Sequence, residues 1–145
     1  KLTYTTSNKA VATVDAAGKV TVKGPGVVKI TVKAAATTDY KAASKTVTVT
    51  VAPKKQSISL VNKIKKQLTI KWKKNTKASG YQVVYSTNKK FTGKKTVRKA
   101  KTTTSYKIKG LKKGEKYYVK VRSYKTVNGK RIYGAYSTAK KATIK

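Results

Sequence analysis

Short runs in which apolar and polar residues alternate recur along the whole chain, and no long stretch shows a helical period. Such a period of two is typical of strands that bury one face. Four runs precede residue 52 and seven follow it, at a spacing typical of a sandwich. The sequence therefore predicts an all-β fold of two tandem β-sandwiches, whose strands we expect at residues 11–15, 19–23, 27–34, 44–51, 57–61, 67–73, 80–86, 94–99, 105–109, 116–124 and 140–145.

The stretch "APKKQS" (52–57) predicts the boundary between the two units, because Pro53 cannot donate to a β-ladder and its neighbours are polar. We expect one domain at residues 1–52 and a second at residues 53–145. Asn128-Gly129 is a strong hairpin signal. We expect this hairpin to join the last two strands.

Alternation also assigns the two faces of the strands in the second unit. A slip of one residue would bury Lys71, Lys120 and Arg122, so the register is strongly specified. We expect the inward residues to be Leu68, Ile70, Trp72, Tyr81, Val83, Tyr85, Tyr117, Val119 and Val121. We expect the outward residues to be Lys71, Lys73, Gln82, Val84, Tyr118, Lys120 and Arg122.

The chain has a formal net charge of +34, with 37 Lys and Arg against three acidic residues. Residues 1–52 carry eight lysines and two aspartates, whereas residues 53–145 carry the other 29 cations and Glu115. Such a surface attracts polyanions, including nucleic acids nonspecifically at low salt. Only three cations are arginine, the residue whose rigid fork suits base-edge recognition. The basicity is therefore diffuse and does not indicate sequence reading.

The composition argues against catalysis, a cofactor and a metal site. The chain has no Cys and no His, and its apolar runs are too short to insert into a membrane. We expect Asp15 and Asp39 to bond backbone amides in turns. Glu115 lies in the "KKGEK" turn, where we expect it to be exposed, which argues against an isopeptide crosslink that needs a buried acid.

The second unit resembles a fibronectin type III module. The resemblance rests on Trp72, on "GYQVVYS" (80–86) and on "LKKGEKYYVKV" (111–121), which is similar to the tyrosine corner of that family. It implies that Leu111 caps the core, that Gly114 makes the turn and that the Tyr117 hydroxyl bonds back to the preceding loop. "YGAYST" (133–138) resembles the entry to the family's last strand.

The first unit resembles the bacterial immunoglobulin-like domain, group 2, through "YTTSNKAVATVDAAGKVTVKGPGVVKITV" (4–32) and "TVTVTV" (46–51). The match covers only the later strands, so we expect the opening strands to be lacking from this immunoglobulin-like sandwich. The pairing of the two modules resembles secreted or wall-associated multidomain proteins of Gram-positive bacteria. It implies an extracellular or cell-wall location, a spacer or adhesion role, and other domains of the parent chain as partners.

Polyanion binding is the one specific function that the residues themselves suggest. Cations and tyrosines interleave on the expected outer faces, where an aromatic ring can stack on a base or a sugar at about 1–3 kcal/mol each. Anionic wall polymers and host glycans are the candidate partners. Two alternatives stay open, a carbohydrate-binding accessory module of a secreted hydrolase and a nucleic-acid binder. The candidate residues are Lys71, Lys73, Tyr118, Lys120, Arg122, Tyr124, Lys130 and Arg131.

Overall fold

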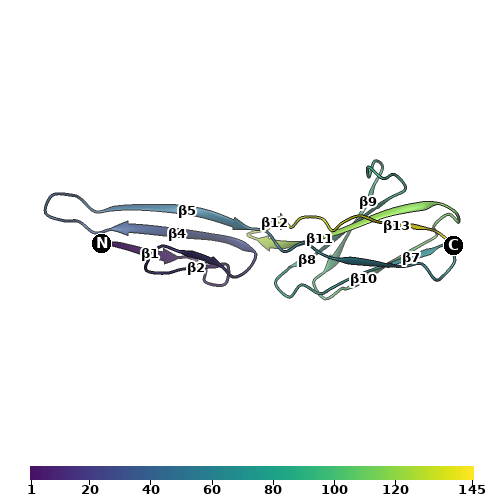
Figure 1. Ribbon diagram of the computed structural model, residues 1–145, viewed down its shortest axis with the longest axis horizontal. Helices are drawn as coiled ribbons and strands as arrows, with labels where there is room; N and C mark the ends of the chain where they lie inside the picture. The colour runs from purple at the N-terminus through teal and green to yellow at the C-terminus, as the bar shows by residue number, and fades with distance from the viewer.

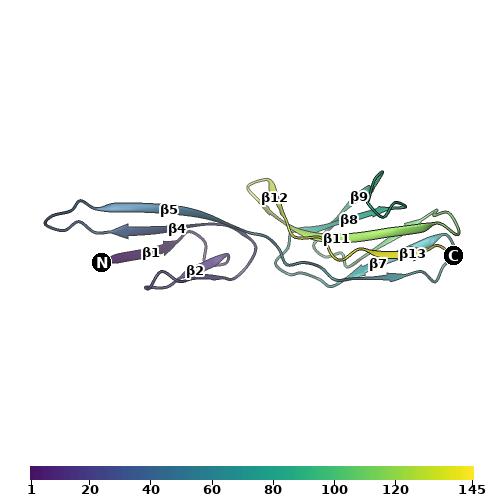
Figure 2. The same ribbon diagram turned by 45° about the horizontal axis from the view of Figure 1, so that its top comes forward.

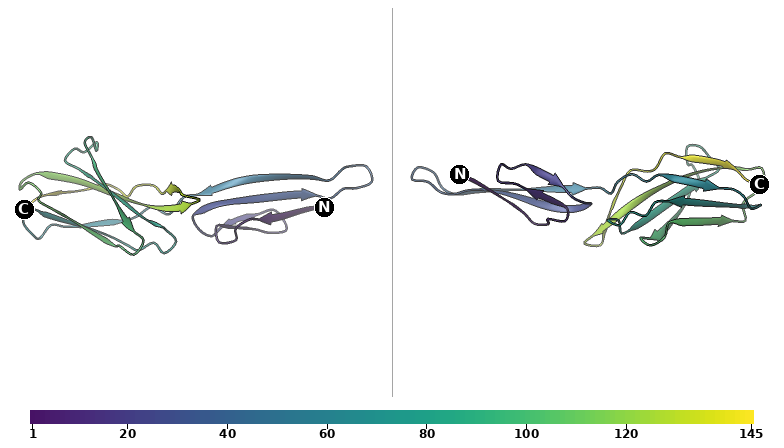
Figure 3. Two further views of the ribbon diagram at one scale, coloured as in Figure 1. Left: turned by 180° about the vertical axis from the view of Figure 1, so that it is seen from behind. Right: turned by 60° about the horizontal axis from the view of Figure 1, so that its bottom comes forward.

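The computed structural model describes all residues 1–145 and consists of strands, turns and loops, without a helix. Two β-rich units lie end to end in one elongated molecule (Figure 1). The same arrangement is visible when the molecule is turned (Figures 2 and 3). The predicted all-β class is confirmed. No helix that is long and apolar enough to cross a membrane is present.

The first unit contains a three-stranded antiparallel sheet of order β1-β4-β5 and a two-stranded sheet of β2 and β3. Asp15 organises the turn between β2 and β3, because its Oδ1 accepts bonds from the backbone N–H groups of Ala17 and Lys19. The sequence predicted four of the five strands and missed the first. The strands are β1 (Leu2–Thr6), β2 (Ala12–Val14), β3 (Val20–Val22), β4 (Gly26–Ala34) and β5 (Ala43–Val51).

The core of the first unit is small. Four buried residues form it, namely Val11, Ala12, Val28 and Ile30. Val47 on β5 is 50% exposed and Val22 on β3 is 57% exposed, although both lie in strands of clear alternation. Because buried apolar area supplies the main folding free energy, this unit has less to hold it together than the second unit.

The second unit is a sandwich of two antiparallel sheets. One sheet has the order β10-β7-β6, and the other has the order β12-β11-β8-β9 with β13 also paired to β11. Seven of these strands were predicted from the sequence, and β12 was not. The strands are β6 (Ile58–Val61), β7 (Gln67–Trp72), β8 (Gly80–Ser86), β9 (Lys95–Ala100), β10 (Ser105–Lys109), β11 (Lys116–Val127), β12 (Lys130–Tyr133) and β13 (Lys140–Thr143).

The sequence placed the hairpin turn correctly but predicted the wrong second strand for it. Asn128 and Gly129 have φ angles of 48° and 74°, the positive values that a two-residue turn of this kind requires. The turn joins β11 to the short strand β12. Residues 134–139 then connect β12 to β13, which pairs with the beginning of β11. β12 and β13 thus share one edge of the same long strand.

The inward residues predicted for β7, β8 and β11 are confirmed as part of the core. Leu68, Ile70, Tyr81, Val119 and Val121 are each 0% exposed. The remaining buried members of this cluster are Ile58, Trp72, Val83, Tyr85, Ile108, Leu111 and Ile144, with Tyr117 packed against it.

Two residues predicted to face outward are nevertheless buried, since Gln82 is 7% and Val84 is 0% exposed. Their strand, β8, lies between β9 and β11 in the sheet. Alternation assigned these residues to the outer face correctly, but further side chains cover that face.

The linker between the units is packed against the second unit. Pro53 and Gln56 are buried. A Cβ added at Gly134 would collide with the Pro53 carbonyl, so only glycine allows this approach. The Ser123 hydroxyl donates to the Lys54 carbonyl at 3.2 Å and accepts from Gln56 Nε2 at 3.3 Å. Of the polar residues beside Pro53, only Gln56 is buried, whereas Lys54, Lys55 and Ser57 are exposed as their polarity implies.

We expect Val28→Ala to destabilise the first unit by about 1–3 kcal/mol while leaving the second unit unchanged, because the two cores are separate. Hydrogen exchange should show faster exchange in β4 and β5 and unchanged protection in β7, β8 and β11. Val22→Ala is the matched control, since its exposed side chain should change stability by less than about 0.5 kcal/mol. Loss of protection in both units would contradict the separation of the cores.

Candidate functional site

The structure divides the eight predicted polyanion-binding residues between the two sheets. Lys71 lies on β7 and Lys73 directly follows it, so both belong to the sheet β10-β7-β6. The other six belong to the opposite sheet, on β11 and β12, and are Tyr118, Lys120, Arg122, Tyr124, Lys130 and Arg131. The candidate residues therefore do not form one continuous face.

Arg122 lies between two aromatic rings on the outer face of the second sheet. Its guanidinium carbon is 3.9 Å from the Tyr133 ring centroid and 4.3 Å from that of Tyr136. Its Nε donates to Gln82 Oε1 at 2.7 Å, and the Tyr136 hydroxyl donates to the same oxygen at 3.0 Å. These contacts explain why Gln82 is buried.

Lys120 repeats this arrangement two residues earlier on the same face of the strand. Its Nζ is 4.0 Å from the Phe91 ring centroid and 4.5 Å from that of Tyr136. Phe91 is 9% exposed and has a φ of 60°, which is unusual for a bulky residue. The loop before β9 thus turns sharply to place this ring over the sheet. We call Phe91, Lys120, Tyr136, Arg122 and Tyr133 the cation–aromatic stack.

The stack changes the interpretation of the predicted site. A cation over an aromatic face is stabilised by about 0.5–2 kcal/mol, depending on its desolvation. Lys120 and Arg122 are half-buried, and each contacts two rings of its own chain. These cations and rings stabilise the outer layer of the fold and are not free to stack on bases. Sequence reasoning missed Phe91, Tyr133 and Tyr136, although the "YGAY" spacing held two of them.

Two predicted residues at the hairpin, Lys130 and Arg131, remain exposed. The Arg131 guanidinium is 5.5 Å from the Tyr124 ring centroid, and Tyr124 packs edge-on against Tyr133 at 5.7 Å. Tyr118 is half-buried on the outer face of β11. Of the candidate cations on this sheet, Lys130 and the solvent-facing side of Arg131 are thus available to a partner.

The tyrosine corner forms at the opposite end of β11. Leu111 is 6% exposed and Gly114 has a φ of 81°, as the resemblance implied. The Tyr117 hydroxyl donates to Glu115 Oε2 at 3.1 Å, so it reaches the preceding loop through a side chain. Glu115 is half-buried, which corrects the expectation of full exposure. Burial, followed by the bond to Glu115, raises the pKa of Tyr117 above its ordinary value of 10.0.

The three acidic side chains lie in three different loops. Asp15 is in the β2–β3 turn, Asp39 is in the β4–β5 loop and Glu115 precedes β11. A two-carboxylate mechanism requires its acids to face each other across the reacting bond. This arrangement offers no such pair.

The model of the fibronectin type III domain matches residues 51–138, which is more than half of the chain. The chain belongs to the fibronectin type III family. Residues 1–37 match the model of the intimin immunoglobulin-like domain. The immunoglobulin-like character of the first unit is thus supported. The matching model is the intimin immunoglobulin-like domain, whereas the resemblance named the bacterial immunoglobulin-like domain, group 2.

One sequence relative is a Kelch domain-containing protein of Sulfurisphaera tokodaii, with 35% identity over 85 residues. The match covers 59% of this chain and 11% of that protein, so the chain spans a small part of this relative.

Solved structures show the fold. The sixth fibronectin type III domain of human fibronectin type III domain containing protein 3 has a TM-score of 0.53 and 15% identity, covering 66% of this chain and 88% of that domain. Chicken CNTN1 domains FN1–FN3 have a TM-score of 0.54 and 18% identity, covering 88% of this chain and 47% of that chain. Such modules are typically extracellular and non-catalytic.

We expect Arg122 and Tyr136 to be energetically coupled in this fibronectin type III domain. A double-mutant cycle of Arg122→Gln and Tyr136→Leu should give a coupling of about 0.5–2 kcal/mol in denaturant unfolding, because either single variant already removes the contact between the guanidinium and the ring. The pair of the exposed Arg131 and the half-buried Tyr124 is the control and should couple more weakly, because the guanidinium lies 5.5 Å from the ring centroid. Strict additivity at Arg122 and Tyr136 would contradict a stabilising stack.

We expect Tyr117 to make stability depend on alkaline pH. Its folded pKa lies above the unfolded value of about 10, so the protonated phenol stabilises the fold below that pH, and this contribution is lost as the pH rises through the folded pKa. The stability difference between the native sequence and Tyr117→Phe should be constant from pH 7 to 9 and should shift against the native sequence above pH 10. Burial beside Tyr85 raises the pKa of Tyr106 as well, but Tyr106 is present in both proteins and cancels in the comparison. A difference that does not change with pH would contradict the assignment.

Proposed function

We propose that this chain is a spacer segment of an exported multidomain surface protein, which holds a neighbouring domain away from the cell and presents a basic surface to anionic polymers. The resemblance of the paired modules to proteins of Gram-positive bacteria supports a cell-wall or extracellular setting. Membership of the fibronectin type III family supports a non-catalytic role.

The observation that carries the spacer role is the anchored junction. The two units lie end to end (Figure 1), and the linker between them is held by Pro53, Gln56 and Ser123. The Lys77 ammonium group also donates to the Lys23 carbonyl across the junction. A linker with fixed backbone keeps the separation of its flanking domains constant, whereas a free linker does not.

The basic surface of this proposal consists of cations without an intramolecular partner. Lys71, Lys107 and Lys109 project from the sheet of β6, β7 and β10, and all three are exposed. Lys73 directly follows β7 and is exposed beside them, whereas the exposed Lys130 lies on β12 in the opposite sheet. Lysine at this density also opposes aggregation through strand edges, so charge alone does not define a ligand.

The other candidate functions have less support. An accessory module of a secreted hydrolase has the same architecture, and its catalytic domain would belong to the longer parent chain. A single-strand nucleic-acid binder needs free aromatic rings beside its cations. In this domain Phe91, Tyr133 and Tyr136 contact the chain's own cations.

Small-angle X-ray scattering tests the spacer role. We expect an elongated particle with one narrow distribution of distances between the units. Gly134→Ala should broaden this distribution, because the new methyl group displaces the Pro53 carbonyl and releases the linker. Gly110→Ala is the control, since its Cβ has no neighbour within 4 Å and only its φ of 68° opposes the substitution, so the linker should stay in place. A native protein that samples bent and extended arrangements would overturn the spacer role.

A further inference from the structure

The linker between the two units is a ridge with a hollow on each side. We call the linker residues 54–57 and these two hollows the linker groove. The first hollow is about 370 Å³ and lies between the linker and the loop after β7. Its lining residues are Lys54, Lys55, Gln56, Ser57, Lys73, Lys74, Asn75, Thr76 and Lys77.

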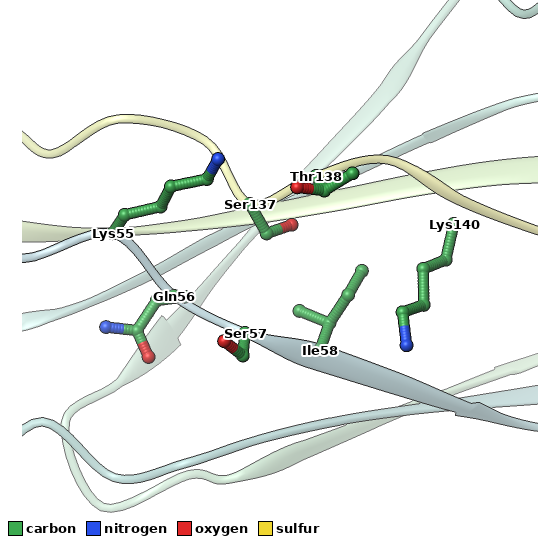
Figure 4. A pocket seen from close by; sticks show the side chains of 7 residues that line it. All are labelled: Lys55, Gln56, Ser57, Ile58, Ser137, Thr138 and Lys140. Atoms are coloured by element: carbon green, nitrogen blue, oxygen red, sulfur yellow. The ribbon is translucent and has the colours of Figure 1, made fainter.

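The second hollow is about 480 Å³ and lies between the linker and the segment before β13. Lys55 and Lys140 stand at its two ends, with Ser137 and Thr138 above Ser57 in the view of Figure 4. The hollows share Lys55, Gln56 and Ser57, so a ligand that crosses the linker contacts both.

Hydrogen bonds hold the walls of the groove in place. Tyr81 is 0% exposed, and its hydroxyl accepts the Asn75 backbone N–H at 2.6 Å. Asn75 Oδ1 then accepts the Lys77 backbone N–H at 3.1 Å, which fixes the loop after β7. On the other wall Ser123 and Gln56 fix the linker backbone. A site with prearranged walls loses less conformational entropy when it binds a ligand.

Six lysines line the two hollows, and no carboxylate does. They are Lys54, Lys55, Lys73, Lys74, Lys77 and Lys140. The acidic side chain of the second unit, Glu115, accepts the Tyr117 hydroxyl at the opposite end of β11 from the junction. Backbone anchoring thus holds these lysines around the linker without a compensating charge in the lining. An anion that enters the groove relieves their mutual repulsion.

We propose that the linker groove binds an anionic extracellular glycan polymer through its sulfate or phosphate ester groups. The lining supplies lysine point charges, which suit the sulfate or phosphate groups of such a polymer. It also supplies hydroxyl and amide groups, which can bond the hydroxyl groups of the polymer. It contains no aromatic ring, and stacking on such rings is what single-stranded nucleic acids require. This inference rests on the proposed contact with anionic polymers and assigns it to a defined site.

Calorimetric titration at ~0.15 M salt, near physiological ionic strength, tests the groove. The probes are heparin for sulfate, poly(glycerol phosphate) for phosphate, oligo(dT) for nucleic acid and dextran as the uncharged polymer. The groove variant combines Lys55→Gln, Lys74→Gln and Lys140→Gln. The matched control combines Lys89→Gln, Lys94→Gln and Lys113→Gln, which removes the same charge from exposed positions outside the groove.

We expect the native protein to bind heparin or poly(glycerol phosphate) and not dextran. The preference between heparin and poly(glycerol phosphate) identifies whether the groove favours sulfate or phosphate groups. In the groove variant, affinity should fall about tenfold or more, and the slope of log K against log salt should decrease by about one for each lysine that contacts the polymer. The control variant should retain affinity within about threefold, because its lysines act only through long-range attraction.

Equal losses in the two variants would overturn the groove and leave the broader contact with anionic polymers standing. Tighter binding of oligo(dT) than of both heparin and poly(glycerol phosphate) would overturn the glycan assignment. Absence of binding to every probe at this salt concentration would overturn both the groove and the proposed polymer contact. The scattering experiment decides the spacer role separately.

Discussion

The pairing register of β11 against β8 is the constraint on which the rest of the second unit depends. It sets Val119 and Val121 opposite Tyr85 and Val83 inside the sandwich. The same register turns Lys120 and Arg122 outward, beneath the rings of the cation–aromatic stack. A shift by one residue would exchange these two sets and bury two cations in an apolar core, which costs several kcal/mol for each ion.

The same alternation couples the core to the junction. Ser123 follows Val121 on the inner side of β11 and is 0% exposed, yet its hydroxyl has partners in Lys54 and Gln56. The strand that fills the sandwich therefore also anchors the linker. This anchoring sets the positions of the lysines around the linker groove, so the electrostatic character of the junction follows from core packing.

The stack and the groove show two ways in which a chain of +34 charge arranges its cations. In the stack, aromatic faces compensate Lys120 and Arg122, and partial burial strengthens each contact. In the groove no aromatic ring faces the lysines, and those other than Lys77, which donates to the Lys23 carbonyl, remain available to an external anion. A count of charges along the sequence does not distinguish these two environments, because the rings of the stack come from separate segments of the chain.

The sequence by itself determined the all-β class, most strands, the inward faces of β7, β8 and β11, the hairpin turn and the tyrosine corner. The strands, their faces and the hairpin turn follow from local rules, since alternation and positive φ at Asn128 and Gly129 depend on neighbouring residues. The tyrosine corner was implied by the resemblance to the fibronectin type III family. Only the tertiary structure decided that Gln82 and Val84 are buried, that Lys71 and Lys73 lie apart from β11, and that the linker forms a ridge between hollows. These features arise where segments distant in sequence meet, and a period of two carries no information about which side chains will cover an outer face.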